Sequence, residues 1–355
     1  MPAGYTLLRK NHYPLTLTTL GLLLSLVLGY STSVLAGPWS DLEEHYTVFD
    51  APNATLTYAA NINDRGIVTG YFFDASRRIH GFIREEGGKI TVIDATPDAK
   101  DTEPAATNTW GETVGIGEGG SFIRNRRGDI TLFTVPDSVF TYASGINDRG
   151  EIAGIFFDQA TRNRHGFVRD VRGNITAFDP PNGYNTSVSG INFNGDVVGN
   201  FLDSSQGAIQ RIYIRDWRGD FNVIDIPDVA APWVAGINDR RDIAGYYNTG
   251  RQIFGFLRDR SGAVVKLDVS SPDVTGMNDR GEVVGIFGDP SRGGKICGFV
   301  WDPRGGVTVL DAPNSTATYA YSINNRGEVS GGFDIAGLGS QRRGFVFKMD
   351  RESRW

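Results

Sequence analysis

The sequence is poor in residues that carry covalent or redox chemistry. Its 355 residues include one cysteine, Cys297, four histidines and three methionines. A single cysteine cannot form an intramolecular disulfide, so packing and strand pairing must stabilise the chain, and we expect Cys297 to be a buried, inert thiol. The chain also lacks GxSxG, HExxH and phosphate-binding glycine motifs. We therefore predict no catalytic residue, no metal ligand and no cofactor.

Positive charge is also scarce. The chain has 35 Lys and Arg against 41 Asp and Glu, a net charge of −6. Removing residues 1–36 removes Arg9 and Lys10 and no acid, which leaves 33 minus 41, or −8. This balance excludes a strongly basic nucleic-acid binder, so we expect no nucleic-acid partner.

Only one long apolar run is present, at residues 15–36. It follows Arg9 and Lys10 and ends in small residues before Gly37, which is typical of a cleaved secretory signal peptide. We predict a signal peptide over 1–36, a short leader over 37–45, a folded domain over 46–350 and a tail over 351–355, in a secreted or periplasmic protein. An uncleaved membrane anchor is the alternative, because about 20 apolar residues span a bilayer.

The rest of the chain consists of seven copies of one unit, for which GINDRGEIAG at residues 145–154 is the model. The first Asn recurs at Asn63, Asn108, Asn147, Asn192, Asn238, Asn278 and Asn324, which number repeats 1 to 7 below. The last Gly recurs at Gly70, Gly115, Gly154, Gly199, Gly245, Gly285 and Gly331. The Asn residues are spaced by 45, 39, 45, 46, 40 and 46 positions. This period is typical of four-stranded propeller blades.

Each unit contains four apolar segments that we interpret as antiparallel strands a to d, with the small-residue strand a innermost. The chain begins with a d-type strand at 47–50 and ends with a c-type strand at 344–349. An open array would expose strand edges, so the N-terminal strand should complete the last blade. The sequence predicts an all-β, seven-bladed β-propeller with four strands per blade, closed in this way.

The Gly-Ile-Asn-Asp-Arg-Gly turn, the Val-Val-Gly-like strand and the His-Gly-Phe strand resemble the extracellular repeats of the HAF family, named for His-Ala-Phe. The resemblance covers residues 46–349, although Gly replaces Ala throughout and His remains only at His80 and His165. Because that family is defined by sequence and export, the resemblance implies a repeat fold and an extracytoplasmic location, and leaves the activity open.

The Asn-Asp-Arg-Gly turn has two interpretations. Asp and Asn oxygens can bind calcium, but calcium needs six to eight oxygens and each copy offers at most one Asp. We favour a structural hairpin in which the Gly has a positive φ and the seven Asn residues stabilise the turn. Arg241, at the Gly position of repeat 5, should carry strain of about 1 kcal/mol. The Phe of each Gly-Phe strand should pack between blades.

The b–c loops differ between repeats, and most of them carry basic residues. The predicted binding face comprises Arg77, Arg78, His80, Arg162, Arg164, His165, Arg211, Trp233, Arg251, Arg292, Lys295, Arg342 and Arg343. One interpretation is an anion-binding rim for an acidic glycan or an acidic protein patch. The other is a solvated face that Asp74, Asp158, Asp203 and Asp289 neutralise. Metal or acid-base roles for His80 and His165 are less well supported than structural ones. Trp233, placed in the d–a loop, is the best candidate for an exposed contact.

Three function classes follow. The first is an exported, non-catalytic and monomeric propeller that binds a partner or glycan through the loop-rich face. The alternative is a propeller enzyme, such as a lactonase, lyase or glycoside-acting hydrolase, with carboxylates in the channel and a divalent metal. The third is a purely structural envelope protein. Fold alone does not choose among them, because propellers host unrelated activities.

Overall fold

The computed structural model describes residues 43–226, 229, 231–335 and 341–349, which all lie in one compact unit, Leu35–Trp355. The described chain is almost entirely β-structure. Its helices are three single-turn 3-10 segments, η2 (Glu43–His45), η3 (Ser204–Gln206) and η4 (Pro290–Arg292). The predicted signal peptide, most of the leader and the tail lie outside the described residues. No helix within the described ranges is long and apolar enough to cross a membrane.

The strands follow the repeats, with strands a to d of each repeat in chain order. Repeat 1 has β2 (Leu56–Ile62), β3 (Val68–Phe73), β4 (Ile79–Arg84) and β5 (Ile90–Ile93); repeat 2 has β6 (Thr102–Thr107), β7 (Thr113–Gly117), β8 (Gly120–Arg124) and β9 (Ile130–Phe133). Repeat 3 has β10 (Ser138–Ile146), β11 (Ile152–Asp158), β12 (Arg164–Arg169) and β13 (Ile175–Phe178). In repeat 4, strand a is split into β14 (Gly183–Tyr184) and β15 (Gly190–Ile191), followed by β16 (Val197–Asp203), β17 (Ile209–Arg215) and β18 (Phe221–Ile224).

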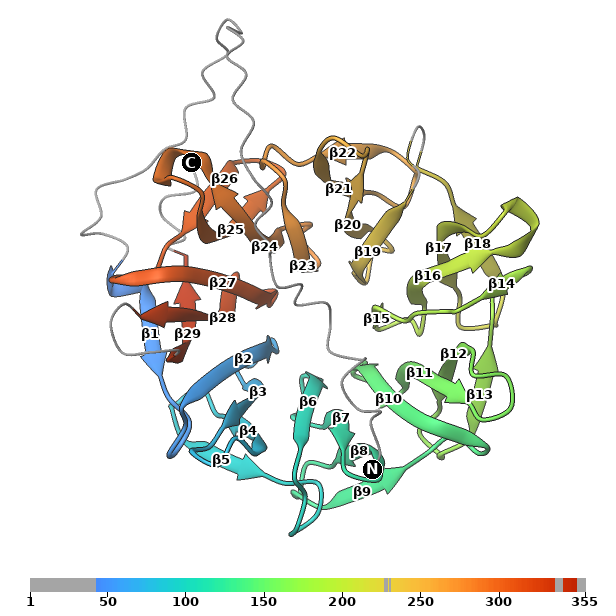
Figure 1. The fold of residues 1–355 in the computed structure, drawn as a ribbon, viewed down its shortest axis with the longest axis horizontal. Coiled ribbons are helices and arrows are strands. Elements are labelled where there is room, and N and C mark those ends of the chain that lie inside the picture. Colours follow the sequence, from blue (N-terminus) through green and yellow to red (C-terminus); the bar gives the residue numbers. More distant parts are fainter. Residues whose placement is uncertain (1–42, 227–228, 230, 336–340, 350–355) are drawn as a thin grey trace, which may run out of the picture. The chain divides into compact units, whose positions relative to one another are not determined.

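The remaining repeats have the same order. Repeat 5 has β19 (Pro232–Ile237), β20 (Ile243–Asn248), β21 (Ile253–Arg258) and β22 (Val264–Lys266); repeat 6 has β23 (Asp273–Met277), β24 (Val283–Asp289), β25 (Lys295–Asp302) and β26 (Gly306–Leu310). Repeat 7 has β27 (Ser315–Ile323), β28 (Glu328–Ile335) and β29 (Arg342–Lys348), and β1 (Tyr46–Phe49) pairs antiparallel with β29. The pairing of the two chain ends is therefore present, as the sequence predicts. The sheets follow one another around a β-propeller (Figure 1).

The grouping of strands differs from seven separate sheets. Repeats 2 to 6 each form their own sheet, whereas repeats 1 and 7 share one sheet of eight strands. The two four-stranded halves of that sheet meet at a single parallel pair, Leu56 with Arg342. Of the seven blades that the sequence predicts, five therefore form sheets of their own. Repeats 1 and 7 share a sheet because the start of strand a in repeat 1 pairs with the start of strand c in repeat 7.

The Gly that closes each sequence motif is fixed by a close approach inside the sheet. A Cβ on Gly154 would lie 2.1 Å from the carbonyl oxygen of Tyr142 on the neighbouring strand. The other six glycines face the equivalent carbonyl at 1.8–2.2 Å. Register shifts in strand a, such as that between Ala143 and Gly145, bring this carbonyl inward. A side chain at this position would therefore collide with backbone.

The core lies between adjacent sheets. The aromatic residue of each Gly-Phe strand is fully buried, as predicted; the set is Phe82, Phe122, Phe167, Tyr213, Phe256, Phe299 and Phe345. One cluster joins Ile212 and Ile224 of repeat 4 to Val234 and Phe256 of repeat 5. Cys297 is buried, and burial raises the pKa of its thiol to about 11, which favours the inert form.

Candidate functional site

The propeller has two different faces. Strand a runs into the Asn turn, and antiparallel pairing brings the c–d turns to the same end; we call this the turn face. The b–c loops and the d–a connections lie at the opposite end, which we call the loop face. Nearly all residues of the predicted binding face belong to the loop face, whereas the seven Asn residues belong to the turn face.

The seven Asn residues form a closed ring of hydrogen bonds. In repeat 3 the Asn147 Oδ1 accepts from the backbone N–H groups of Arg149 (3.1 Å) and Glu151 (3.0 Å), which fixes the turn. Its Nδ2 donates to the carbonyl of Asn192 in the next repeat at 3.0 Å. The same bond joins Asn63 to Asn108, Asn108 to Asn147, Asn192 to Asn238, Asn238 to Asn278, Asn278 to Asn324 and Asn324 back to Asn63, at 2.7–3.2 Å. The predicted structural role of these residues thus includes linking each repeat to the next.

The residue at the Gly position of this turn has a positive φ in every repeat. Arg241 replaces that Gly in repeat 5 and has φ 68°, so the strain predicted from the sequence is present. Its Nε lies 3.0 Å from the Asp196 carboxylate of repeat 4, which is buried. An ion pair between repeats therefore accompanies the strained backbone.

Four carboxylates converge on the axis at the turn face, an arrangement that we did not predict. Asp64, Asp148, Asp239 and Asp279 occupy the same position in four turns, and the Oδ1 of each accepts a backbone N–H from the preceding repeat at 2.7–2.8 Å. Burial, and then repulsion from the other three carboxylates, raise the pKa of Asp239. Within the described residues, no three His, Cys, Asp or Glu side chains are placed to hold a metal ion.

The positive charge predicted for the loop face is largely neutralised. Arg211 binds Asp203 (2.8 Å) and Asp225 (2.6 Å), and Arg342 binds Asp334 at 2.7 Å. Arg292 pairs with Asp289 and Asp311, Lys295 with Asp311 and Arg343 with Asp50. These ion pairs agree with the interpretation of this face as a solvated surface that nearby acids neutralise, because each of these cations has a carboxylate nearby.

The remaining basic residues differ in exposure. Arg77, Arg162 and Arg251 are exposed and form no ion pair within the described ranges. The backbone at Arg77 and Arg162 has φ 63° and 59°, which places both at the tips of tight b–c loops. Arg78 is exposed and donates to the carbonyl of Ala99 at 2.7 Å.

Both histidines of the loop face have carboxylate partners. The His80 Nδ1 lies 2.8 Å from Asp94, and its ring stacks on Phe72. The His165 Nδ1 lies 2.5 Å from Asp179. These contacts are those expected of structural histidines that join strand c to the following d–a connection.

Arg164 differs from every other basic residue of this face. It is half-buried, and its guanidinium donates only to backbone carbonyls, from Nε to Thr186 (3.0 Å) and from Nη2 to Asn185 (3.0 Å). Burial lowers the pKa of the guanidinium. No carboxylate among the described residues forms an ion pair with it.

A cleft of about 310 Å³ lies beside Arg164 at the junction of repeats 3, 4 and 5. Its walls are formed by Phe157, Arg164, Asn185, Ser187, Asn200, Phe201, Leu202, Gln210 and Trp233. Trp233 is half-buried and lies in β19, and not in the d–a loop where the sequence analysis placed it. The cleft thus combines aromatic rings with amide groups and one guanidinium.

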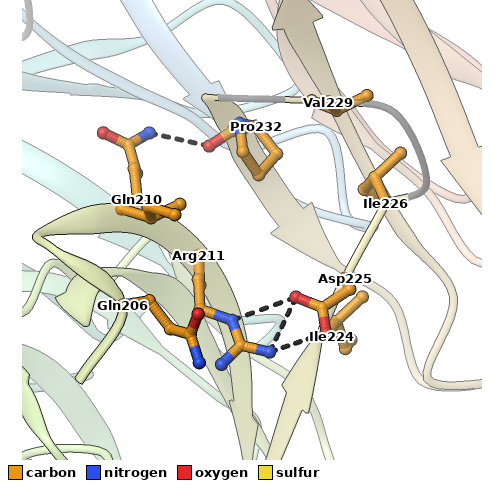
Figure 2. A pocket seen from close by; sticks show the side chains of 9 residues that line it. Gln206, Gln210, Arg211, Ile224, Asp225, Ile226, Val229 and Pro232 are labelled. Atoms are coloured by element: carbon orange, nitrogen blue, oxygen red, sulfur yellow. Dashed lines mark hydrogen bonds and ion pairs between the residues drawn. The ribbon is translucent and has the colours of Figure 1, made fainter.

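A second cleft of about 230 Å³ lies toward the outer edge between repeats 4 and 5 (Figure 2). Gln210 lines both clefts, and its Nε2 donates to the carbonyl of Pro232 at 2.7 Å. In this second cleft Arg211 points toward Asp225, and their ion pair occupies one wall (Figure 2). Its charges are therefore already paired.

Strand a brings further aromatic residues together near the loop face. Five positions before each Asn the repeats carry Tyr58, Glu103, Tyr142, Ser187, Trp233, Asp273 and Tyr319. Tyr58 stacks on Tyr71 with ring centroids 4.7 Å apart. Burial, and then the Glu103 carboxylate, raise the pKa of Tyr142 to about 12. This position ranges from aromatic to acidic between repeats, whereas the residue before it is always Thr or Pro and the residue after it is always Ala, Val or Pro. That variation is the sequence signal that we missed.

Arg342 belongs to the scaffold around these rings. Its guanidinium lies 4.8 Å from the Tyr58 ring centroid and 4.0 Å from that of Tyr319. It also donates to the Tyr321 hydroxyl at 3.0 Å and binds Asp334. Because this guanidinium already contacts two aromatic rings, a hydroxyl and a carboxylate, it holds repeats 1 and 7 together. Few of its N–H groups are left for a ligand.

Comparison with solved structures identifies the fold. The structure is similar to a streptogramin B lyase, with 15% identity, a TM-score of 0.55, and coverage of 86% of this chain and 98% of that one. It is also similar to the β-propeller domain of the Trilobed protease from Pyrococcus furiosus (12% identity, TM-score 0.58, 84% and 96% covered). A third match, an acylaminoacyl peptidase from Pyrococcus horikoshii, has 12% identity and a TM-score of 0.58, with 84% of this chain and 53% of that chain covered. No family model and no curated protein matches the sequence.

Proposed function

We propose that the protein is a non-catalytic carbohydrate-binding propeller and that its ligand occupies the cleft beside Trp233. The observation that carries this proposal is the composition of the cleft walls. Trp233 and Phe157 supply apolar ring faces, while Asn185, Gln210 and Arg164 supply polar groups. Sugars present an apolar face and a polar rim, so a site of this composition can stack the first and hydrogen-bond the second.

The polar groups retain hydrogen-bonding capacity. Gln210 uses its Nε2 on Pro232, and no described residue donates to its Oε1. The Arg164 Nη1 donates to no described group. A sugar hydroxyl can donate to the amide oxygen and accept from the guanidinium. The Asn200 side chain, in contrast, is fully engaged with Arg211, Pro232 and Val234, and holds the cleft wall.

Export and ring size belong to the same proposal. The apolar run at 15–36 and the resemblance to HAF repeats support an extracytoplasmic location. A count of seven blades is supported by the seven-membered Asn ring and by the single residue pair that joins the two halves of the eight-stranded sheet. In this interpretation β1 completes the last blade, and the protein acts as a monomer.

A glycan array tests the proposal. Wild-type protein is compared with Trp233→Ala, and Trp217→Ala is the matched control because Trp217 is 62% exposed on a c–d turn of the opposite face. We expect W233A to weaken binding by about 10-fold or more, since aromatic anchors contribute about 1.5 kcal/mol or more to recognition. W217A should bind as the wild type does.

Two results would count against the proposal. Equal binding by wild type and W233A would place the ligand elsewhere. Turnover of a bound glycan, detected as new reducing ends or unsaturated products, would favour the alternative of a propeller enzyme.

A further inference from the structure

We propose that the sugar recognised in the Trp233 cleft carries a carboxylate, and that Arg164 binds this carboxylate; the inference rests on the proposed carbohydrate-binding function. The ligand class is then an acidic saccharide that contains a uronic acid. The site follows from Arg164, the one basic residue among those described on the loop face that is half-buried and has no acidic partner.

The first step concerns the charge. A buried ion is costly unless an opposite charge or several hydrogen bonds compensate it. Arg164 is half-buried at the start of β12 and is held by two carbonyl oxygens, which carry only partial charges. Its position is fixed by these two bonds, so a ligand does not have to order a long side chain.

The second step is the comparison with equivalent residues. Arg342, at the corresponding place in repeat 7, is paired across the strands with Asp334 and binds its carboxylate, whereas the residue paired with Arg164 in repeat 3 is Phe157. In repeat 3 the carboxylates take other partners. Asp158 is bonded to Thr161 and Ala160, and Asp179 to His165 and Thr186. The carboxylate that neutralises the equivalent arginine of repeat 7 is therefore replaced by Phe157 in repeat 3, and Asp158 and Asp179 are engaged with other groups.

The third step is the placement. Arg164 lies in the wall of a cleft of about 310 Å³, together with Trp233 from repeat 5. A pyranose ring stacked on the indole carries its substituents at the ring edge, toward the polar wall. A planar guanidinium matches a planar carboxylate through two parallel N–H···O bonds, which a hydroxyl cannot form. This geometry favours uronate over neutral sugar.

The test uses paired ligands on the intact protein. Calorimetry measures binding of an oligouronide and of the same oligosaccharide after reduction of its carboxylates to hydroxymethyl groups. A sulfated oligosaccharide of equal charge is the third ligand. We expect the oligouronide to bind about 10- to 100-fold more tightly than either of the others, the range found for one charge-assisted contact in a cleft.

Variants assign the effect to the residue. Arg164→Gln should remove the preference for the oligouronide over the reduced ligand. Arg164→Lys keeps the charge without the planar fork and should retain part of the preference. Arg162→Gln is the matched control, because it removes one exposed positive charge from the same loop. Thermal unfolding of each variant checks that the fold is retained.

The outcomes separate the two proposals. If none of the ligands and no glycan on the array binds, the carbohydrate-binding function itself is wrong. If the reduced or sulfated ligand binds as tightly as the oligouronide, or if R164Q keeps the wild-type preference, the carboxylate assignment is wrong while carbohydrate binding stands. If R164Q does not fold, the relative affinities of the wild-type protein for the oligouronide, the reduced ligand and the sulfated ligand decide whether the ligand carboxylate is recognised.

Discussion

At the scale of single residues, the repeated Asn is the main stabilising feature of the propeller centre. Each one closes its own turn with two accepted hydrogen bonds and reaches the next repeat with a donated one, as Asn147 does to Asn192. The seven residues are buried. A buried polar group that loses its hydrogen-bond partner destabilises the fold by more than the net contribution of the bond. This explains why the Asn is kept in all seven repeats, whereas the Asp that follows it is replaced in some of them.

Replacement of Asn147 by Ala tests this role. The change removes an acceptor for two backbone N–H groups and a donor to the Asn192 carbonyl. We expect the free energy of unfolding to fall by about 2–4 kcal/mol, as for several buried hydrogen bonds lost together. Urea denaturation measures it, with Asn222→Ala, an exposed residue of β18, as the control outside the ring. A loss below about 0.5 kcal/mol would contradict the account.

Some residue roles can be predicted from the sequence and others cannot, for a physical reason. A role shared by seven repeats, such as that of Phe167 in the core, is visible because the repeats confirm one another. A pairing found in one repeat is not visible. Arg211 meets Asp225, which lies 14 positions later, and Lys295 meets Asp311, 16 positions later, only because strands c and d are adjacent. The sequence therefore left the charge of the loop face open between two interpretations, and Arg164 could be singled out only in three dimensions.

At the scale of the element, each sheet depends on a side-chain-free position in strand b. The register shift in strand a pushes a carbonyl toward that position, as Tyr142 does toward Gly154. The strand order and the a–b turn could be predicted from period and turn chemistry. The register shift could not, because a bulge depends on how two particular strands pair. The placement of Trp233 in β19 was also missed, although Trp233 lies five residues before Asn238, as Tyr142 lies five residues before Asn147 in the equivalent strand.

Gly154→Ala measures the cost of filling this space. The new Cβ would lie 2.1 Å from the Tyr142 oxygen and 2.7 Å from the Phe167 ring, so one strand must move. We expect a loss of about 2–4 kcal/mol in unfolding free energy, the scale of overpacking with backbone displacement. Gly87→Ala is the control, because nothing lies within 4 Å of its Cβ position. Equal unfolding free energies for the two variants would contradict this prediction, because they would show that the strands move apart without loss of stability.

At the scale of the whole molecule, the two faces of the propeller differ in chemistry. The turn face gathers Asp64, Asp148, Asp239 and Asp279 around the axis, each already accepting a backbone N–H. The loop face gathers aromatic rings, amides and Arg164. Fixed turns at one end and variable loops at the other are the usual division between scaffold and binding surface.

The acidic ring has a consequence for the pH dependence of stability. The folded-state pKa of Asp239 is raised, so ionisation of this group opposes folding at pH values above that pKa. Asp239→Asn keeps the acceptor for the Phe193 N–H and removes the charge. We expect a gain in unfolding free energy at pH 7 of less than about 1 kcal/mol, because Asp239, although partly desolvated by its neighbours, is exposed at the turn face, where solvent screens its charge.

The pH series supplies the check. The gain of D239N should shrink as pH falls through the folded pKa of Asp239 and vanish below about 3.9, where the unfolded-state carboxyl is also protonated. Asp98→Asn, an exposed acid outside the ring, should show no such gain. A loss of stability in D239N at neutral pH would mean that the carboxylate supports the ring and does not strain it.

The central claim is that recognition takes place in the cleft beside Trp233. A crystal structure of the intact protein with the tightest-binding oligouronide tests it most directly. The account predicts a sugar ring against Trp233 with its carboxylate on the Arg164 guanidinium. A ligand bound at the acidic turn face, or on the loop face away from Arg164, would contradict it.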